Sequence, residues 1–344
     1  LFGGRSGEHE ISVRSAASVV QGLAVLHDVL PVLVDRRGGW KLQDGPGVSE
    51  EGGTPVFLVP SPSDRGVLRR LQDGSMIAKP DIYFPVLHGT FGEDGTIQGL
   101  FELADVPYVG AGVLASAVGM DKEMMKAVFQ SHGLPIVEYL VVRRHEWQQA
   151  PERVGARVAQ TVGFPCFVKP VNLGSSVGIS KVASSRELPA AIDLAARHDR
   201  KIIIERGIDA REIEVSVLGN EEPKASLPGE ISYNAEWYDY STKYLEGQSR
   251  LTIPAPVSAE TTRRLQELAV AAFRAIDCSG MARVDFFVER STDRVVVNEI
   301  NTIPGFTATS AYAKMWAASG LPYAELVDRL IQLALERHQG KGGG

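Results

Sequence analysis

The chain has 344 residues, of which 44% are hydrophobic and 23% are charged, and its formal net charge is −6. These values are ordinary for a globular protein of two or three domains, and they exclude a basic surface for nucleic acid or an anionic membrane. No apolar run is long enough to span a bilayer, and Cys166 and Cys278 stand in apolar surroundings, which indicates buried thiols in a reducing compartment.

The first third of the chain alternates predicted strands and helices. The sequence begins abruptly within a strand that ends at Gly4, so we expect several native residues to be missing before it. A helix is predicted from Glu10 to Leu26, strands are predicted at Val29–Val34 and Ile82–Leu87, and residues 45–66 predict a surface excursion rich in Pro, Gly and Ser. This order predicts a small, doubly wound α/β domain whose ligand-binding loops follow the carboxyl ends of its strands.

Two polar segments stand at such strand ends. In Gly3–Glu10, GGRSGEHE, Glu10 begins the predicted helix, where the helix dipole is a sufficient structural reason for a carboxylate. A sharper interpretation is that Glu10 lies at a cleft and holds a substrate ammonium group. In His88–Gly95, HGTFGEDG, His88 directly follows a strand. A loop histidine is most often a bystander, but this position is the favoured one for ligands.

A second unit begins near Asp121, whose side chain can cap a helix that ends before Gly133. The apolar positions of this helix, predicted to point inward, are Met124, Met125, Val128 and Phe129. Further strands are predicted at Val137–Val142, Cys166–Lys169, Ile179–Val182 and Ile202–Glu205, and further helices near Glu152–Thr161 and Arg186–Ala196.

Several residues of this unit suit a nucleotide. Lys169 ends a strand, and the N–H groups of the small-residue loop 172–178 could surround phosphate oxygens; the ordinary alternative is a glycine-rich hairpin turn. The loop is not a Walker A motif, because no Gly-Lys-Ser/Thr closes it. Lys122 could reach the same phosphates, although a helix-terminal lysine is usually solvated. Glu205 ends an apolar strand where a carboxylate could contact a nucleoside, and Glu212 follows on the next strand.

A third unit follows from residue 208. Strands are predicted at Ile213–Leu218 and Lys224–Leu227, then a helix capped by Ser258 and a final helix that starts at Pro322. Residues 233–249 are polar and unusually aromatic, with WYDYSTKY in the middle. This density of aromatic side chains favours a lid that closes over a ligand.

Met281–Asn301, MARVDFFVERSTDRVVVNEIN, is the most informative stretch and predicts a β-hairpin. Alternation places Arg283 and Asp285 on one face of the first strand, and Glu299 and Asn301 on one face of the second. If the hairpin closes about its STD turn, Arg283 lies roughly opposite Glu299. Two carboxylates and an amide oxygen beside an arginine suit a divalent cation. The alternative is the solvated face of an antiparallel sheet.

The segment after this hairpin, NTIPGFT, contains a Pro-Gly turn at residues 304–305. The backbone N–H of Gly305 could stabilise an oxyanion together with Arg283, while an ordinary type II turn would explain the same residues. Ser310 follows, within reach of a carboxylate.

Taken in order, these segments resemble D-alanine–D-alanine ligase, an ATP-grasp enzyme, across almost the whole chain. The matching motifs are GGRSGEHEIS, HGTFGEDGTIQG, MDK, VKP with GSSVG, YDYSTKY, ARVDFF and NEINTIPGFT. The resemblance implies a three-domain α/β architecture: an N-terminal substrate-binding domain at 1–118, a central ATP-grasp domain at 119–207, and a C-terminal catalytic domain at 208–340 with the lid at 233–249. It implies ATP-dependent joining of two D-alanine molecules through a D-alanyl phosphate, for peptidoglycan precursors, in the cytoplasm and by a homodimer.

The resemblance also implies roles for individual residues. Mg²⁺ or Mn²⁺, as two ions, would be held by Asp285, Glu299 and Asn301. ATP would be contacted by Lys122, Lys169, Ser175, Ser176, Val177, Glu205, Glu212 and Lys243. The first D-alanine would lie at Glu10 and His88, and the carboxylate of the second at Ser310. Arg283 and the Gly305 N–H would stabilise the tetrahedral intermediate. Tyr244 would link through Ser175 to Glu10 and, with Lys243, close the lid.

Three alternatives remain open in the sequence. The nearest is a D-alanine–D-lactate or D-alanine–D-serine ligase; the lactate enzymes resemble this chain but place a histidine near Tyr244, so Tyr244 after Lys243 favours D-alanine. Another ATP-grasp ligase, such as a glutathione synthetase, is disfavoured by GGRSGEHE and HGTFGEDG. A nucleotide-binding regulator without catalysis predicts the loss of a metal ligand or Arg283, and all are present.

Overall fold

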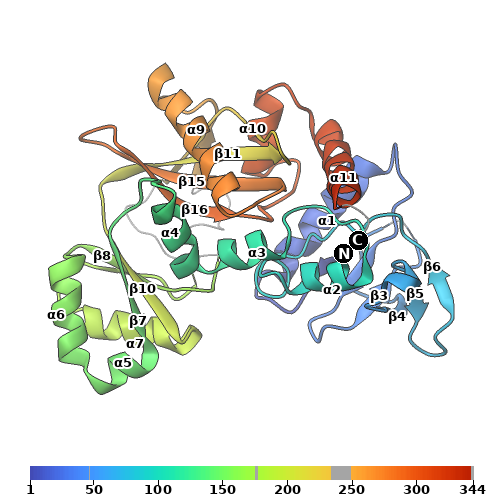
Figure 1. Ribbon diagram of the computed structural model, residues 1–344, viewed down its shortest axis with the longest axis horizontal. Helices are drawn as coiled ribbons and strands as arrows, with labels where there is room; N and C mark the ends of the chain where they lie inside the picture. Colours follow the sequence, from blue (N-terminus) through green and yellow to red (C-terminus); the bar gives the residue numbers. More distant parts are fainter. Residues whose placement is uncertain (46, 175–176, 234–248, 342–344) are drawn as a thin grey trace.

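The computed structural model describes residues 1–344 except 46, 175–176, 234–248 and 342–344, and it contains three β-sheets that follow one another along the chain (Figure 1). The mixed α/β class agrees with the prediction. Each sheet falls within one of the three predicted domain ranges, while the domain boundaries themselves stay predictions. Within the described residues, no helix combines the length and apolarity needed to cross a bilayer.

The first sheet has the order β1-β2-β3-β4-β5-β6, in which β1 and β2 are parallel and the later pairs are antiparallel. Its strands are β1 (Phe2–Gly3), β2 (Val32–Val34), β3 (Trp40–Leu42), β4 (Thr54–Leu58), β5 (Leu68–Arg70) and β6 (Met76–Ala78). The helices of this part are α1 (His9–Leu23), η1 (Pro62–Asp64), α2 (Thr96–Ala104) and α3 (Val113–Met120). The predicted excursion at 45–66 therefore contains a strand and a short helix.

The predicted strand at Ile82–Leu87 is wrong as a regular strand, because only Tyr83 pairs, in a parallel bridge with Tyr108. The segment is nevertheless extended beside β1. The Leu1 amino group donates to the Phe84 carbonyl at 2.8 Å, and Val86 N donates to the Leu1 carbonyl at 2.8 Å. His88, which directly follows this segment, is therefore positioned by backbone bonds to the start of the chain.

The second sheet is antiparallel, with the order β7-β10-β8-β9. Its strands are β7 (Tyr139–Arg143), β8 (Cys166–Pro170), β9 (Ser180–Val182) and β10 (Lys201–Arg206). The helices are α4 (Lys122–Ser131), α5 (Arg144–Gln149), α6 (Pro151–Thr161) and α7 (Leu188–His198). Val158, Ile192 and Ile204 belong to one buried cluster between this sheet and its helices, which explains the apolar periodicity of α6 and α7.

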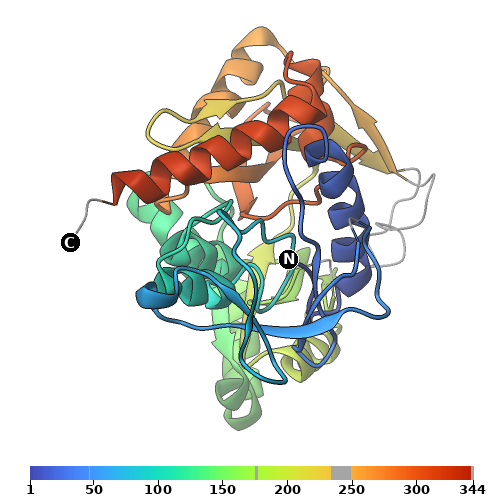
Figure 2. The same cartoon turned by 90° about the vertical axis from the view of Figure 1, so that its right-hand side faces the viewer.

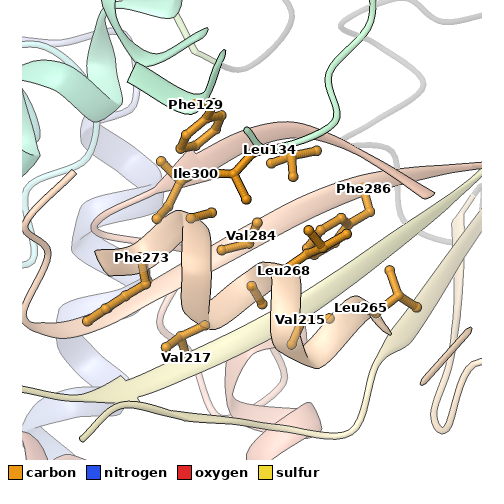
Figure 3. Packing of buried hydrophobic residues seen from close by; sticks show 14 of the residues in the cluster. Phe129, Leu134, Val215, Val217, Leu265, Leu268, Phe273, Val284, Phe286 and Ile300 are labelled. Atoms are coloured by element: carbon orange, nitrogen blue, oxygen red, sulfur yellow. The ribbon is translucent and has the colours of Figure 1, made fainter. Parts of the chain in front are cut away.

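Helix α4 begins as predicted at Asp121, whose carboxylate accepts the N–H groups of Glu123 and Met124, each at 3.1 Å. The prediction that Met124 points inward is wrong: its side chain is 48% exposed, whereas Met125 and Phe129 are fully buried. Phe129 and Leu134 pack on the third sheet (Figure 3), and Met125 belongs to the same buried cluster, so α4 lies over that sheet.

The third sheet has the order β14-β13-β11-β15-β16, with β12 paired to β11. Its strands are β11 (Ala210–Gly219), β12 (Lys224–Ala225), β13 (Gly229–Tyr233), β14 (Ser249–Thr252), β15 (Gly280–Glu289) and β16 (Val295–Asn301). The helices are α9 (Ala259–Ala275), α10 (Ala311–Ala318) and α11 (Tyr323–Gly340). Helix α9 is capped as predicted by Ser258, which accepts from Thr261 N at 3.0 Å.

Strand alternation separates the core of this sheet from its polar face. Val215, Val217, Val284 and Phe286 lie beneath α9 with its Leu265, Leu268 and Phe273 (Figure 3). Glu212, Glu214, Arg283 and Asp285 occupy the intervening positions, so they point to the opposite face. That face is where the cavities described below are found.

Helix α11 connects the first and third sheets. Its Val327 and Leu330 share a buried cluster with Val19 and Leu23 of α1 and with Met281 of β15. Figure 2 shows α11 running past the end of α1. Gly22 of α1 allows this approach, because an added Cβ would lie only 3.1 Å from the Tyr323 ring and the Val327 side chain.

Candidate active site

Two adjoining cavities lie between the three sheets. The larger has a volume of about 410 Å³, and its polar lining comes from Glu8, His88, Glu93, Lys122, Arg283, Glu299, Asn301, Gly305 and Ser310. The smaller has a volume of about 180 Å³, and its polar lining comes from Lys122, Lys169, Glu205, Glu212, Glu214, Asp285 and Glu299. Lys122, Gly174 and Glu299 line both cavities, so the two spaces meet at these residues.

The hairpin of β15 and β16 forms as predicted, but the predicted register is wrong. Arg283 pairs with Asn301, and Asp285 pairs with Glu299. The strand pairing shifts between Asp285 and Phe286, which leaves Asn298 as an extra residue in β16. The consequence is that the two carboxylates expected to hold metal lie directly opposite one another.

Arg283 is held on the polar face by carboxylates. Its Nε and Nη2 atoms donate to the two oxygens of Asp285, both at 2.7 Å, and Nε lies 3.3 Å from Glu214 Oε1. Burial acts to lower the pKa of Arg283, but the charges of Asp285 and Glu214 outweigh burial and raise it well above its ordinary value. Arg283 is therefore a fixed, permanent positive charge at the wall of the larger cavity.

The oxygen atoms of Asp285, Glu299 and Asn301 fit a hard divalent cation. Asp285 and Glu299 face each other across the ladder, and Asn301 Nδ2 donates to Asp285 Oδ2 at 3.1 Å, which brings all three side chains together. No group of three or more His, Cys, Asp or Glu side chains suited to a metal occurs in the described part of the chain. Mg²⁺ usually binds one or two carboxylates and completes its coordination with water and substrate phosphate, and the side chains of this set match that pattern.

Two lysines and one glutamate form a buried cluster beside the smaller cavity, of which Lys169 and Glu205 line the cavity and Lys126 lies behind them. Glu205 Oε1 lies 2.9 Å from Lys126 Nζ, and Glu205 Oε2 lies 2.5 Å from Lys169 Nζ. Burial alone would raise the pKa of Glu205, but Lys126 and Lys169 outweigh burial and lower it to about 2. Lys126 also donates to the Asn298 carbonyl at 3.3 Å, so it joins β10 to the irregular point of β16.

Lys122 and Lys169 enter the cavities from different elements. Lys122 Nζ donates to the Leu173 carbonyl at 2.9 Å and lies 3.6 Å from Glu299 Oε2. Lys169 extends from β8 to Glu205 of β10. Two cations near the loop at 173–174 make this wall of the cavities suitable for an anionic group.

The expected position of Glu10 at the cleft is wrong. Its side chain is 73% exposed and pairs with Arg36 at 2.6 Å on the outer surface. Glu8 lines the larger cavity instead, together with Ile11. Helix α1 begins at His9, and each helical residue turns the chain by about 100°, so Glu10 faces away from the side occupied by Glu8 and Ile11.

His88 lines the larger cavity, but both of its ring nitrogens already have partners. Nδ1 lies 3.0 Å from the Ile303 carbonyl oxygen, and Nε2 lies 3.1 Å from Ser15 Oγ. Its side chain is almost wholly buried, and burial lowers its pKa, whereas the charge of Glu8 acts in the opposite direction. The imidazole is therefore neutral at pH 7.

Glu93 is a buried carboxyl group of the same cavity. It accepts the N–H of Gly89 at 2.6 Å and the N–H of Ile303 at 3.3 Å. Burial, and then the charge of Glu8, raise the pKa of Glu93 to about 8, against the opposing effect of these N–H groups and of Arg283.

Gly305 and Ser310 lie together in the lining of the larger cavity. Ser310 Oγ accepts from Thr307 N at 3.0 Å and lies 2.8 Å from Thr307 Oγ1. It is also 3.5 Å from the position that a Cβ on Gly305 would take. The predicted oxyanion donor and the predicted carboxylate-binding hydroxyl are thus neighbours.

Four predicted residues lie outside the described part of the chain: Ser175, Ser176, Lys243 and Tyr244. The same holds for residues 234–248 of the predicted lid, which connects the paired strands β13 and β14. Val177 is described, and its N–H donates to the Gly174 carbonyl at 3.4 Å. Glu212 lines the smaller cavity as expected of a nucleotide contact.

Four residues in or near the walls of the cavities were not among the site residues predicted from the sequence: Glu8, Ser15, Glu93 and Lys126. Glu8 and Glu93 belong to the motifs GGRSGEHE and HGTFGEDG, so the motifs were found but the particular residue was not. Lys126 carried one signal, a lysine on the apolar face of a predicted helix between Met125 and Phe129. Such a residue is buried only when it is paired.

Two antiparallel sheets contribute carboxylates and lysines to the adjoining cavities. Comparison with known proteins assigns this arrangement to the ligases of the ATP-grasp class. The family model for the D-ala D-ala ligase N-terminus matches residues 1–111, and the model for the D-ala D-ala ligase C-terminus matches residues 128–332. The chain belongs to the D-alanine–D-alanine ligase family.

Individual relatives agree with this assignment. A D-alanine–D-alanine ligase of Heliobacterium modesticaldum is 52% identical over 353 residues, which cover 99% of this chain and 95% of the relative. A ligase of the same name from Solibacter usitatus is 52% identical over 342 residues, 99% of this chain and 96% of the relative. The solved D-alanine–D-alanine ligase of Coxiella burnetii has a TM-score of 0.86 at 39% identity, with 99% and 94% of the two chains covered. The VanG D-Ala:D-Ser ligase of Enterococcus faecalis has a TM-score of 0.86 at 37% identity, with 97% of each chain covered.

Proposed function

We propose that this protein joins two D-alanine molecules to D-alanyl-D-alanine, with ATP as the source of energy, for peptidoglycan precursors. Membership of the D-alanine–D-alanine ligase family supports this activity. The observation that carries it is the larger cavity, in which the carboxylate of Glu8 stands on one wall and the cation of Arg283, with the Gly305 turn, on another. A zwitterionic amino acid requires this combination of opposite charges.

In the first step, the carboxylate of one D-alanine attacks the γ-phosphorus of ATP, and ADP leaves with the electrons of the broken P–O bond. We assign Glu8 to the ammonium group of this D-alanine. Lys122 and Lys169 hold the phosphate oxygens, and Glu205 and Glu212 contact the adenosine. This step depends on charge neutralisation and in-line positioning rather than on a strong base.

A magnesium or manganese ion, and by family expectation two, would be held by Asp285, Glu299 and Asn301. When bound, the ion would neutralise charge on the phosphate oxygens. Both oxygens of Asp285 accept from Arg283, so Asp285 would use its remaining lone pairs for that ion, with Glu299 directly opposite it in the ladder.

In the second step, the neutral amine of the other D-alanine attacks the acyl carbon, and phosphate leaves with the electrons of the C–O bond. The nitrogen loses one proton, which is accounted for in the hydrogen phosphate product. Arg283 and the Gly305 N–H stabilise the negative oxygen that develops on the tetrahedral carbon. Ser310 binds the carboxylate of the attacking D-alanine. Ser175, Ser176 and Val177 of the small-residue loop 172–178, with the lid residues Lys243 and Tyr244, would keep water from the acyl phosphate.

Phosphate release from ATP tests the proposal. We expect the purified protein with Mg²⁺ to release phosphate when D-alanine alone is added, with D-alanyl-D-alanine as the product by mass spectrometry. No phosphate release with D-alanine would contradict the proposed function.

The D-Ala:D-Ser relative makes D-serine the specific competitor to measure. When D-alanine is supplied together with D-serine or with D-lactate, we expect less of the mixed product than of D-alanyl-D-alanine. A larger yield of either mixed product would move the assignment to the corresponding ligase.

We further propose a cytoplasmic location, where ATP is available, and a homodimer, which sedimentation velocity can measure.

A further inference from the structure

The hydroxyl group of Ser15 on α1 connects three segments that are far apart in the sequence. Ser15 Oγ lies 3.1 Å from His88 Nε2 and accepts from the backbone N–H of Phe306 at 3.4 Å. His88 Nδ1 lies 3.0 Å from the Ile303 carbonyl oxygen. Ser15 is fully buried and His88 is 4% exposed, so water does not compete for these bonds.

The partners fix the direction of each hydrogen bond. The Ile303 carbonyl can only accept, so His88 Nδ1 carries the hydrogen and donates. The imidazole is neutral, because burial lowers the pKa of His88. Nε2 therefore has a free lone pair and accepts from the Ser15 hydroxyl, whose oxygen accepts from Phe306. His88 is thus held as the Nδ1–H tautomer, which an exposed histidine would not select by itself.

These hydrogen bonds hold both ends of the turn at residues 303–306. At one end, His88 binds the Ile303 carbonyl while Glu93 accepts the Ile303 N–H at 3.3 Å. At the other end, Ser15 accepts the Phe306 N–H. Between these ends lie only Pro304 and Gly305, and the Gly305 N–H is the proposed donor to the oxyanion. An oxyanion donor is effective only if its position is set before the charge develops.

We propose that Ser15 is a positioning residue of the ligase reaction, which acts through His88 to hold the 303–306 turn so that the Gly305 N–H points at the reacting carbonyl. The proposal rests on the function given above and goes beyond it, because Ser15 lines neither cavity and acts only through other residues. His88 then serves the reaction through the turn rather than as a ligand of D-alanine. We expect loss of the Ser15 hydroxyl to lower kcat, because the position of the turn matters most when the oxyanion forms.

Ser12 provides a matched control on the same helix. It is also fully buried, and its hydroxyl accepts from Gly3 N at 2.7 Å and donates to the Val86 carbonyl, so it ties α1 to the first sheet and not to the 303–306 turn. Ser12→Ala and Ser15→Ala each remove one buried hydroxyl group with two partners. Both should lower the melting temperature by similar amounts.

The two variants should differ in catalysis. We expect Ser15→Ala to lower kcat by about tenfold or more, the range for an imperfect oxyanion donor, with the KM for ATP within about twofold. Ser12→Ala should keep kcat within about twofold of the unmodified protein, and Ser15→Thr, which retains the hydroxyl, should recover most of the loss. Equal losses of kcat in Ser12→Ala and Ser15→Ala, or no loss in Ser15→Ala, would overturn the proposal.

The tautomer of His88 tests the hydrogen-bond directions without any assay of activity. The chain has 7 histidines, and the His88→Gln variant identifies the ring signals of His88 in the ¹⁵N-labelled protein. We expect a protonated Nδ1 and an unprotonated Nε2. An active enzyme whose His88 carries its proton on Nε2 would overturn this proposal alone, whereas an enzyme inactive with D-alanine would overturn the proposed function itself.

Discussion

Glu8 and Glu10 show how strongly two residues of the same type can differ within one motif. Glu8 precedes α1 and lines the larger cavity, while Glu10 lies in the first turn and pairs with Arg36 on the surface. The motif was predicted correctly as a cavity segment, but Glu8 and not the predicted Glu10 lines the cavity. The side that a residue faces depends on the residue at which the helix begins, and helix boundaries inferred from sequence are uncertain by a few positions.

A matched pair of substitutions separates these two carboxylates. Glu8→Gln removes the charge proposed to hold the ammonium group and should lower kcat/KM for D-alanine by about 100-fold, the scale expected for one partner of a buried charge pair. Glu10→Gln should change kcat/KM by less than about twofold, because an exposed ion pair contributes little. Steady-state kinetics with varied D-alanine measures both, and an equal effect of the two substitutions would contradict the assignment.

At the scale of elements, Lys126 connects three pieces of secondary structure. It projects from α4, pairs with Glu205 of β10 and donates to the carbonyl of Asn298, the extra residue of β16. Its side chain is 1% exposed. The alternation of polar and apolar residues predicted β10 and the hairpin, but it could not reveal the extra residue, since Asn298 continues the strand without a glycine or proline. The register was wrong for that reason.

Lys126→Met should destabilise the protein and weaken ATP binding together. The buried carboxylate of Glu205 would keep only Lys169, and breaking a buried pair on one side costs about 3–5 kcal/mol in free energy of unfolding. Because Glu205 lines the smaller cavity, the KM for ATP should rise by about tenfold or more. Chemical denaturation and ATP-dependent kinetics give the two values.

Lys201→Met is the control for this variant. Lys201 also joins β10 to the α4 region, through Asp121 and through Glu123 at 2.9 Å, and its side chain is 7% exposed. Neither lysine lines a cavity, but the partner of Lys126, Glu205, does, whereas Asp121 and Glu123, the partners of Lys201, do not. Lys201→Met should lower the free energy of unfolding while leaving the KM for ATP within about twofold. If Lys201→Met raises the KM for ATP as much as Lys126→Met, the effect is one of general destabilisation.

At the scale of the whole molecule, α11 holds the first and third sheets together. Arg337 near its end donates to the carbonyls of Gly110 and, at 2.9 Å, Tyr108, and to Ser279 Oγ at 2.9 Å. Its guanidinium also lies 4.2 Å from the centre of the Tyr108 ring. The sequence predicted the helix from its apolar spacing, but the contacts of Arg337 with Tyr108 and Gly110 join residues more than 200 positions apart and could not be predicted from spacing.

Arg337→Ala should lower the free energy of unfolding by about 2–4 kcal/mol, because it leaves buried carbonyl groups without donors. Arg329→Ala on the same helix is the control. Arg329 pairs with Glu336 at 2.8 Å, and both side chains are about half exposed, so its loss should cost less than about 0.5 kcal/mol. Urea denaturation of the two variants compares them directly, and similar losses would show that Arg337 is not a connection between the sheets.

Lys122 and Glu299, 3.6 Å apart, belong to the walls of both cavities. A ligand that draws either side chain toward itself in one cavity alters the electric potential in the other. The free energy of binding in the two cavities is therefore coupled, and thermodynamic linkage makes that coupling reciprocal. If nucleotide increases the affinity for the first amino acid by some factor, the amino acid increases the affinity for nucleotide by the same factor, so neither dissociation constant is defined without stating the concentration of the other ligand.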